Sequence, residues 1–389
     1  MLVRLRLVGG EPGGSEGELR TEKDDLGFAT IPEIIRAARI RLPPGRWDHA
    51  SGGVESETTL RRNRLAMETI AFRPRLLQGI AAPDIRTSFL GQQLDSPVLL
   101  APIGSIMLFS ENGAVGPARV AARRGTIFCY GILSWPDLAE VGAVAPGRLV
   151  LQLYIRGDRA WLRDVVQKAE AANYLALCVT ADSVGGANRD RDLHNRYQGR
   201  AGTLHPNLPP GAGPGLEHQV RFSWDDFDWL RANTHLPLML KGVTTTDDAL
   251  TAIEHGAAVV YVSNHGGREL DHLPATLEVL PEIVAAVDGR AEIIVDGGFL
   301  RGTDVVKALA LGARAVLLGK LQVWALAAGG EAGLDRALEL LDHEIRETLQ
   351  LLGATSVSEL GPSYVRPTTP TRLGVSDWND YEWAPMPRP

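Results

Sequence analysis

The chain has 389 residues, of which 44% are hydrophobic and 22% are charged, so its composition excludes bulk disorder and a collagen-like fibre. Its 40 lysine and arginine residues face 47 aspartate and glutamate residues, giving a formal charge of -7. This balance disfavours the basic surface of a nucleic-acid-binding protein. No apolar run reaches the roughly 20 residues that a membrane helix needs, and no signal-peptide pattern opens the chain. We therefore expect a soluble, cytoplasmic protein.

The two cysteines favour a structural role. Cys129 and Cys178 both lie in apolar runs, where a small buried hydrophobic side chain is the common interpretation. Their number and spacing match neither a disulfide framework nor a zinc site. We expect no bound metal.

The first periodic segments follow an irregular start. Residues 1–27 are rich in Gly, Glu and Arg without a sustained period, which predicts a flexible N-terminal tail. Helical patterns then occur at Ile31–Arg41 and Ser56–Thr69. From residue 98 onward, short apolar runs alternate with helical segments. These runs are candidate strands at Val98–Pro102, Thr126–Tyr130, Leu149–Tyr154, Ala176–Thr180, Pro237–Lys241, Val259–Ser263, Glu292–Asp296 and Ala315–Leu318.

The alternation predicts an α/β fold, a (β/α)8 TIM barrel. Helical patterns such as Asp158–Ala172, Thr246–Gly256 and Arg301–Gly312 separate the strands, and Thr245 is a candidate N-cap. Such units need right-handed crossovers and a parallel sheet covered on both faces. Eight of them favour a closed barrel over an open doubly wound sheet. We assign residues 28–361 to this barrel.

Two segments interrupt or follow the pattern. The long gap at 183–236 is predicted to be a polar, mobile lid over the barrel mouth, with a Pro- and Gly-rich middle at Thr203–Gly215. Residues 362–389 lose periodicity and are predicted to be a C-terminal tail. Because this tail carries aromatic residues, we expect it to pack on its own barrel or on a neighbouring subunit.

Glycine turns follow the last two predicted strands. One is Asp296-Gly297-Gly298, before Arg301 at the start of a helix, and the other is Gly319-Lys320. Backbone amides at helix N-termini bind phosphate, and in barrels the loops after strands 7 and 8 are the recurrent place for it. A single glycine pair would more simply be a chain turn. Two such turns on adjacent strands, each near a cation, favour a phosphate site.

A second cluster follows the sixth strand. His265 can take a proton near neutral pH, and Arg268 can bind a carboxylate through its planar guanidinium group. A single loop histidine is usually a surface residue, but the flanking glycines allow close approach to a flat ligand. Polar residues at the ends of other strands complete the cluster: Gln152, Tyr154, Thr180, Asp182, Arg189 and Lys241.

Two members of the cluster have a specific expectation. Lys241 lies in an apolar run, and a buried lysine without a partner would be costly. We therefore expect it to face an anionic or electron-rich group. Asp182 could simply cap a helix, but its strand-end position opposite His265 favours orienting and stabilising an imidazolium.

Four runs carry a resemblance to a known family: LQLYIRGDR, TADSVGGANRDRDLHNRY, SNHGGRELD and VDGGFLRGTDVVKALALGARAVLLGK. Between about Ile31 and Leu360 the chain resembles the FMN-dependent α-hydroxy acid oxidases and dehydrogenases. The resemblance implies an FMN-binding TIM barrel. It also implies that a 2-hydroxy acid is oxidised to a 2-oxo acid, and that oxygen or another acceptor reoxidises the flavin.

The resemblance also implies roles for individual residues. His265 matches the catalytic base and Asp182 its partner, while Arg268 and Arg189 match the arginines that bind the substrate carboxylate. Tyr154 matches the tyrosine that bonds the substrate. Expected contacts to the cofactor come from Pro102, Ile103, Gly104, Gly131, Gln152, Thr180, Lys241, Ser263, Asp296, Gly297, Gly298, Arg301, Gly319 and Lys320.

The sequence departs from the family pattern at four positions. Asp48 stands where a tyrosine usually helps to bind the substrate carboxylate, so we expect Asp48 at the substrate. Leu300 and Lys320 stand where arginines are usual, which leaves phosphate binding to backbone amides, Lys320 and Arg301. Gly104 stands where much of the family has alanine. We expect this glycine to leave room for a bulkier substrate or for oxygen.

Three alternatives stay open at this stage. A related flavin barrel could oxidise an amine or a modified metabolite or peptide, and a non-redox isomerase should lack the pair of His265 and Arg268. A binding barrel that has lost catalysis is favoured by Asp48 and Leu300 but opposed by the retained polar cluster. We expect small-molecule ligands rather than nucleic acid or membrane as partners, and a homo-oligomer, specifically a tetramer.

Overall fold

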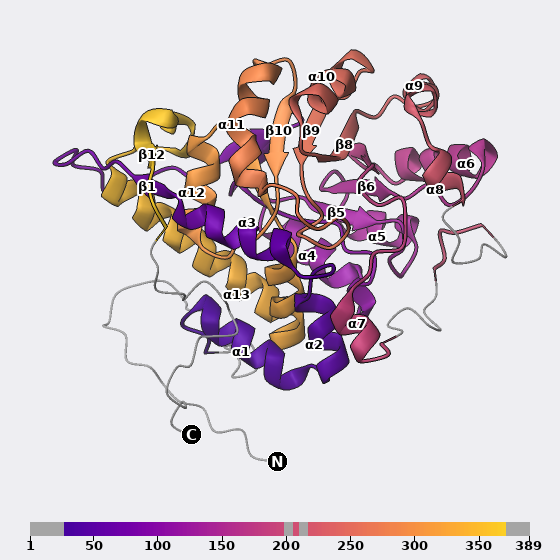
Figure 1. The fold of residues 1–389 in the computed structure, drawn as a ribbon, viewed down its shortest axis with the longest axis horizontal. Coiled ribbons are helices and arrows are strands. Elements are labelled where there is room, and N and C mark those ends of the chain that lie inside the picture. The colour runs from indigo at the N-terminus through magenta and orange to yellow at the C-terminus, as the bar shows by residue number, and fades with distance from the viewer. Residues whose placement is uncertain (1–26, 198–204, 210–216, 371–389) are drawn as a thin grey trace, which may run out of the picture.

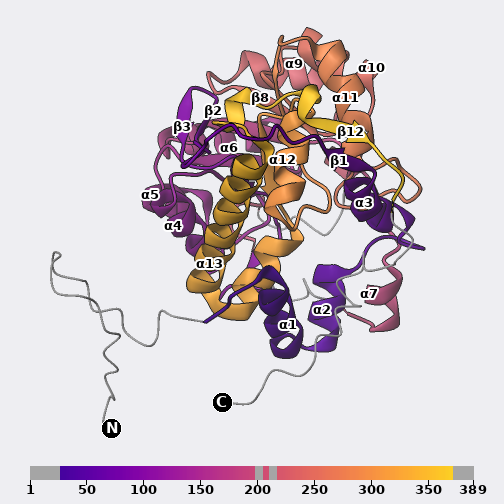
Figure 2. The same cartoon turned by 90° about the vertical axis from the view of Figure 1, so that its left-hand side faces the viewer.

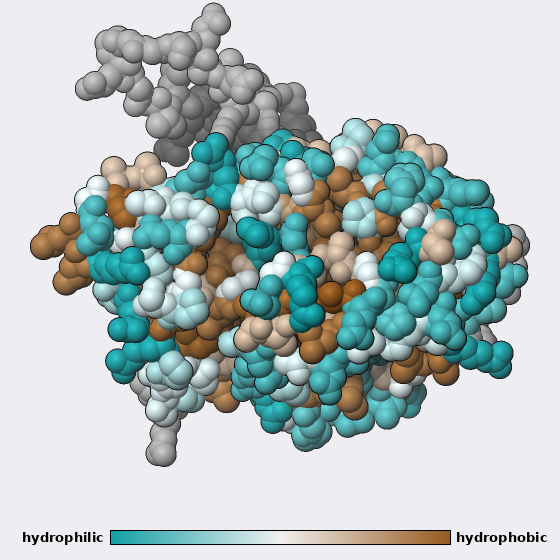
Figure 3. All heavy atoms as spheres, turned by 90° about the horizontal axis from the view of Figure 1, so that it is seen from above, coloured by the Kyte–Doolittle hydropathy of each residue, from teal (hydrophilic) through white to brown (hydrophobic). Residues whose placement is uncertain are grey.

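The computed structural model describes residues 27–197, 205–209 and 217–370. Residues 1–26 of the predicted flexible tail (1–27) lie outside these ranges, as do most of the Pro- and Gly-rich stretch and residues 371–389. In the described part of the chain, no helix is both long enough and apolar enough to cross a membrane. Hydrophilic residues cover much of the face in Figure 3, with smaller hydrophobic areas between them.

A closed barrel of eight parallel strands forms the centre of the molecule (Figure 1). All eight predicted strands are confirmed; two have the predicted ends and the ends of the other six differ by at most two residues. The strands are β4 (Val98–Leu100), β5 (Phe128–Gly131), β6 (Leu149–Leu153), β7 (Ala176–Thr180), β8 (Leu238–Val243), β9 (Val259–Val262), β10 (Glu292–Val295) and β11 (Ala315–Leu318). The barrel closes where β11 pairs with β4 in parallel, with Leu318 opposite Leu100.

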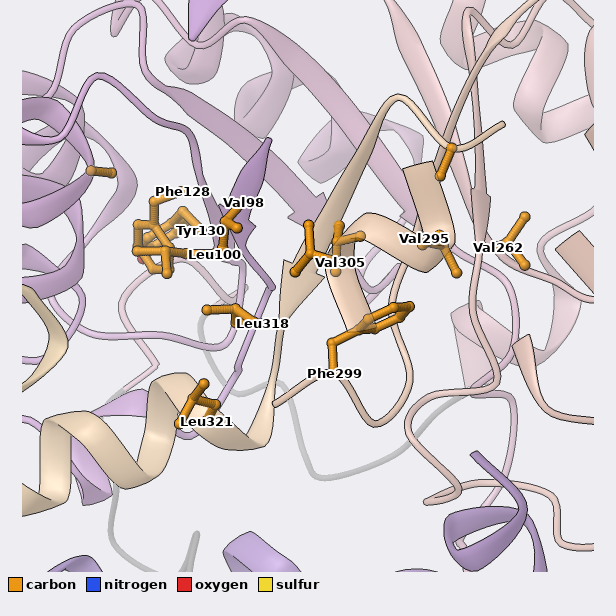
Figure 4. Packing of buried hydrophobic residues seen from close by; sticks show 14 of the residues in the cluster. Val98, Leu100, Phe128, Tyr130, Val262, Val295, Phe299, Val305, Leu318 and Leu321 are labelled. Carbon is orange, nitrogen blue, oxygen red and sulfur yellow. The ribbon is translucent and has the colours of Figure 1, made fainter. Parts of the chain in front are cut away.

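The strands are buried on both faces, which explains their nearly continuous apolar sequences. Alternate residues fill the barrel interior, including Leu99, Cys129, Cys178 and Leu317. Burial raises the pKa of the Cys178 thiol to about 12, as expected for a structural cysteine. The other set faces the helices, and Figure 4 shows part of this layer around Leu318.

Helices cover the outside of the barrel. They are α4 (Val115–Arg123), α5 (Leu138–Val144), α6 (Arg159–Ala171), α9 (Trp224–Ala232), α10 (Thr246–Glu254), α11 (Thr276–Val287), α12 (Gly302–Ala310) and α13 (Lys320–Leu352). The predicted N-cap is confirmed, because the side chain of Thr245 accepts a hydrogen bond from the backbone of Asp248. Helix α13 bends at Gly329 and Gly330, whose dihedral angles are not helical.

The long segment between β7 and β8 contains helices. These are α7 (Asp190–His194), α8 (Glu217–Arg221) and α9. Helix α7 packs against α2 (Pro44–Ser51) of the N-terminal segment, and the two helices lie side by side in Figures 1 and 2. The prediction of a mobile lid stays a prediction, but its first part is held against the N-terminal helices by this contact.

The ends of the chain pack around the barrel. Helix α1 (Ile31–Arg41) packs on α13, and α3 (Thr58–Glu68) packs on α11. Strand β1 (Ile70–Phe72) pairs with β12 (Val365–Pro367), so part of the predicted C-terminal tail forms a strand on its own barrel. The hairpin of β2 (Thr87–Phe89) and β3 (Gln92–Leu94) adds Phe89 and Leu94 to the interior core. The 3-10 turns are η1 (Ile106–Leu108), η2 (Val357–Glu359) and η3 (Pro362–Tyr364).

Candidate active site

Polar side chains gather around a cavity of about 360 Å³ at the carboxyl ends of the barrel strands. Tyr154 follows β6, Lys241 lies in β8 and His265 follows β9. Asp182, which follows β7, contacts both Lys241 and His265 from behind the lining. The structure therefore brings together side chains that are more than 100 residues apart in the sequence, at the face where barrel active sites form.

His265 is held between an aspartate and a tyrosine. Its Nδ1 lies 2.9 Å from Oδ1 of Asp182, and its Nε2 lies 3.3 Å from the hydroxyl of Tyr154. With Asp182 ionised, Nδ1 carries the hydrogen that is donated to the carboxylate. The lone pair of Nε2 then faces the tyrosine and can accept a proton.

Asp182 also neutralises a buried lysine. The ammonium of Lys241 lies 3.2 Å from Oδ2 of Asp182. Burial alone would raise the pKa of Asp182, but the charge of Lys241 and the hydrogen bond with His265 lower it to about 2. Burial likewise opposes the charge of Lys241, yet Asp182 and Asp296 raise its pKa above the usual range. Both groups are therefore charged at neutral pH.

The loop that carries His265 has an unusual backbone. His265, Gly266 and Gly267 all have positive φ, at 55°, 63° and 71°, a region that costs energy for a residue other than glycine. A Cβ atom on Gly267 would lie 2.6 Å from the backbone nitrogen of Leu60, so only glycine fits there. At the loop's end Asp271 accepts hydrogen bonds from the backbone of Thr58 and Thr59. The start of α3 thus fixes the loop.

Arg268 and Arg189 both line the cavity. Arg268 donates to the backbone oxygens of His49 and Gly52, at 2.7 and 2.8 Å. Arg189 forms an ion pair of 2.7 Å with Glu269 and donates to the backbone oxygen of Arg268. The two predicted carboxylate-binding arginines therefore lie on adjoining loops.

The structure places Asp48 outside the cavity lining, and its expected contact with the substrate stays a prediction. Its carboxylate accepts a hydrogen bond of 2.7 Å from Asn195 and lies 3.6 Å from Arg191, and Asp48 is absent from the cavity lining. His49, the next residue on α2, lines the cavity instead. Consecutive residues on a helix point about 100° apart, so one residue can face outward while the next faces inward.

Most residues expected at the cofactor do line the cavity. They are Pro102, Ile103, Gly104, Gln152, Thr180, Lys241, Asp296, Gly297, Gly298, Gly319 and Lys320. Ser263 lies behind this lining and donates to Asp296 at 2.7 Å. Gly131 lies behind Gly104, since a Cβ atom on Gly131 would be 3.3 Å from the nitrogen of Gly104.

The expected phosphate contact of the Arg301 side chain stays a prediction, and in this structure the side chain has another partner. Its guanidinium forms a 2.8 Å ion pair with Glu344 of α13, and the residue does not line the cavity. Arg301 precedes the first turn of α12, where α12 packs on α13. The partner that holds it is distant in sequence and is not indicated by the glycine motif.

The sequence patterns did not indicate several residues that line the cavity. His49, Arg156 and Glu269 are polar, and Phe109 and Trp324 are aromatic. Glu269 lies within the SNHGGRELD run and pairs with Arg189, so its position next to Arg268 was an available signal. Trp324 follows Lys320 by one helical turn, which also places it near the second glycine turn.

The chain matches the family described as FMN-dependent dehydrogenase over residues 38–367. The chain belongs to this family. It is 39% identical over 352 residues to L-lactate oxidase of Nostoc sp., covering 86% of this chain and 96% of that protein. It is 36% identical over 353 residues to glycolate oxidase 3 of Arabidopsis thaliana, covering 87% and 96%.

Solved structures agree with this assignment. A soluble mutant of the membrane-associated (S)-mandelate dehydrogenase from Pseudomonas putida superposes with a TM-score of 0.83 at 32% identity, over 87% of this chain and 99% of that chain. A mandelate oxidase variant with 2-hydroxy-phenylacetamide gives a TM-score of 0.79 at 35% identity, over 88% and 99%. This member of the FMN-dependent dehydrogenase family is thus an oxidoreductase with FMN as its cofactor.

The residues present fit FMN. Lys320 is a half-buried lysine in the cavity lining. Burial and Arg268 lower its pKa well below the usual range, and the described residues place no carboxylate within ion-pair distance of it. A Cβ atom on Gly319 would meet nothing within 4 Å, so the space above this turn is open. A phosphate group there would supply the negative charge that Lys320 lacks. Elsewhere in the lining Gln152 donates to Thr180 at 2.7 Å, which holds these two polar side chains together at the cavity.

Proposed function

We propose that this enzyme oxidises a 2-hydroxy acid to the corresponding 2-oxo acid. The observation that carries the proposal is the contact of His265 with Asp182 on one side and Tyr154 on the other, with Arg268 in the same cavity. A proton acceptor and a carboxylate-binding arginine in one cavity are what a hydroxy acid requires.

Each side chain has a role in this reaction. Arg268 and Arg189 bind the substrate carboxylate, and the Tyr154 hydroxyl positions the substrate hydroxyl near Nε2 of His265. His265 takes up a substrate proton, and the Asp182 carboxylate stabilises the resulting imidazolium. Bound FMN would supply the acceptor for the two electrons and for the second hydrogen that leave the substrate. Lys241, Gln152 and Thr180 hold the flavin ring, and the two glycine turns with Lys320 hold the phosphate.

The acceptor that reoxidises the flavin belongs to the same proposal. Two relatives carry the name oxidase, which supports oxygen, and a solved relative is a dehydrogenase, which supports another acceptor. The amount of peroxide formed per substrate oxidised distinguishes the two acceptors.

We also propose that the protein is cytoplasmic and forms a homo-oligomer, specifically a tetramer. The exposed Leu76 and Leu77, at 77% and 101%, support a contact between copies, and the mass in solution tests it.

The decisive experiment is rapid mixing of the FMN-loaded protein with a panel of 2-hydroxy acids. We expect the flavin to bleach with at least one member, and the His265→Gln variant to bind FMN but to bleach at least about 100-fold more slowly. A matched control is His343→Gln, because His343 is a surface residue on α13, 67% exposed in its side chain. Failure of the whole panel would contradict the proposal and favour an amine substrate or a barrel without catalysis.

A further inference from the structure

A second histidine lies at the carboxylate end of the cavity. His49 is only 8% exposed and lines the cavity. Its Nδ1 lies 2.9 Å from Oδ2 of Asp192 on α7. Within the described ranges no hydrogen-bond partner reaches its Nε2. The ring therefore connects the first helix of the lid segment to the substrate cavity, with one nitrogen available to a ligand.

His49 lies next to the proposed carboxylate-binding arginine. Arg268 donates a 2.7 Å hydrogen bond to the backbone oxygen of His49 itself and another to Gly52. The ring of Tyr197 packs on the imidazole, with 5.3 Å between centroids. A carboxylate bound by Arg268 therefore lies near the His49 ring.

We infer that His49, held by Asp192, is a substrate-binding residue that takes up a proton when a carboxylate substrate binds and donates its Nε2–H to that carboxylate. The inference deepens the proposed function and rests on it for the class of substrate. Asp48, the residue expected to contact the substrate, faces away from the cavity. The inference gives the binding of the substrate carboxylate to the next residue, His49. In this arrangement Asp192 accepts from Nδ1 in both protonation states.

The surrounding charges explain why the proton arrives with the substrate. Burial lowers the pKa of His49, Asp192 raises it, and Arg268 and Arg189 lower it, with a lowered pKa as the net result. Glu269 is paired with Arg189, and Asp48 on the same helix faces Asn195 and Arg191. The unliganded ring is thus neutral at pH 7. A bound carboxylate offsets the two arginine charges, so the imidazolium becomes favourable.

The test measures anion binding without turnover. Oxalate is the probe, because it is a carboxylate without a carbon-bound hydrogen to transfer. It is titrated into the FMN-loaded protein from pH 6 to 9, with the flavin absorbance change reporting the Kd. Calorimetry in buffers of different ionisation enthalpy reports the protons taken up. The proteins compared are the unmodified enzyme and the variants His49→Gln, Asp192→Asn, His265→Gln and His343→Gln.

We expect the unmodified enzyme to take up protons above pH 7, with a Kd that rises up to about tenfold per pH unit for each proton taken up. In the His49→Gln variant the proton uptake that we assign to His49 should disappear. The His265→Gln variant should keep this part of the uptake, and His343→Gln should match the unmodified enzyme. Asp192→Asn should move the uptake to lower pH, because it removes the carboxylate that favours the imidazolium. Equal uptake with and without His49 would overturn the inference.

The outcomes separate this inference from the proposed function. If hydroxy acids bleach the flavin but His49→Gln leaves proton uptake unchanged, the inference fails and the proposed function stands. If no hydroxy acid bleaches the flavin but oxalate uptake depends on His49, the proposed function fails and the anion site stands.

Discussion

Replacing Asp182 by asparagine tests how the site holds its charges. The side chain keeps its shape but loses the charge that faces Lys241 and His265. A fall of the Asp182 pKa from 3.8 to about 2 corresponds to about 2 kcal/mol of folding stability at neutral pH. Leaving a buried ammonium without its partner costs about 3–5 kcal/mol in comparable cases. We therefore expect the variant to lose about 2–5 kcal/mol.

The pH dependence has a definite sign. Because the folded-state pKa of Asp182 is depressed, its contribution is present above about pH 4 and is lost as the pH falls toward 2. The stability difference between the enzyme and Asp182→Asn should therefore narrow over that window. Chemical denaturation at several pH values measures it.

The same substitution should slow flavin reduction by about 100-fold to 10,000-fold, because the imidazolium loses its stabilising carboxylate. Rapid mixing with a hydroxy acid measures the rate. The double variant Asp182→Asn with Lys241→Met removes both charges, so it should recover stability but not rate. Flavin reduction by Asp182→Asn at the unmodified rate would refute the role of this aspartate.

Three further predictions concern the edges of the site. Gly104→Ala adds a methyl group 3.1 Å from Cβ of Leu133. The variant should slow the oxidation of large hydroxy acids more than that of small ones. Equal slowing of both in steady-state assays would count against a steric role. Lys320→Met should weaken FMN binding at least tenfold in fluorescence titrations of the apoprotein. The control Arg301→Gln should not weaken it, because the native side chain is paired with Glu344 outside the cavity. Unchanged FMN affinity in Lys320→Met would mean that backbone amides alone bind the phosphate. Asp48→Asn should leave the preference between small and large substrates unchanged in kcat/KM, and a shifted preference would return Asp48 to the substrate.

The strands and the face of the site could be predicted from the sequence because both depend on local patterns. Apolar runs of four to six residues bounded by polar ones indicate buried strands, and the strand ends then place Asp182, Lys241 and His265 on one face. The direction of a side chain on a helix or loop cannot be predicted from local patterns, because it also depends on contacts with distant segments. Whether Asp48 or His49 faces inward depends on how α2 is rotated against α7, and Arg301 turns away because Glu344 lies across the α12–α13 contact. Such contacts between distant segments leave no periodic signal.

The position of the Asp182 carboxylate between Lys241 and His265 determines where, in the proposed reaction, a substrate proton stays. In a simple relay, a proton arriving at His265 could pass to the aspartate. Here Asp182 faces the buried ammonium of Lys241 at 3.2 Å as well as the imidazole at 2.9 Å, and its pKa is about 2. Gly242 makes this possible, because a Cβ atom there would lie 2.6 Å from Cβ of Asp182. The carboxylate therefore stays ionised, and in the proposed reaction a proton taken from the substrate remains on the imidazole.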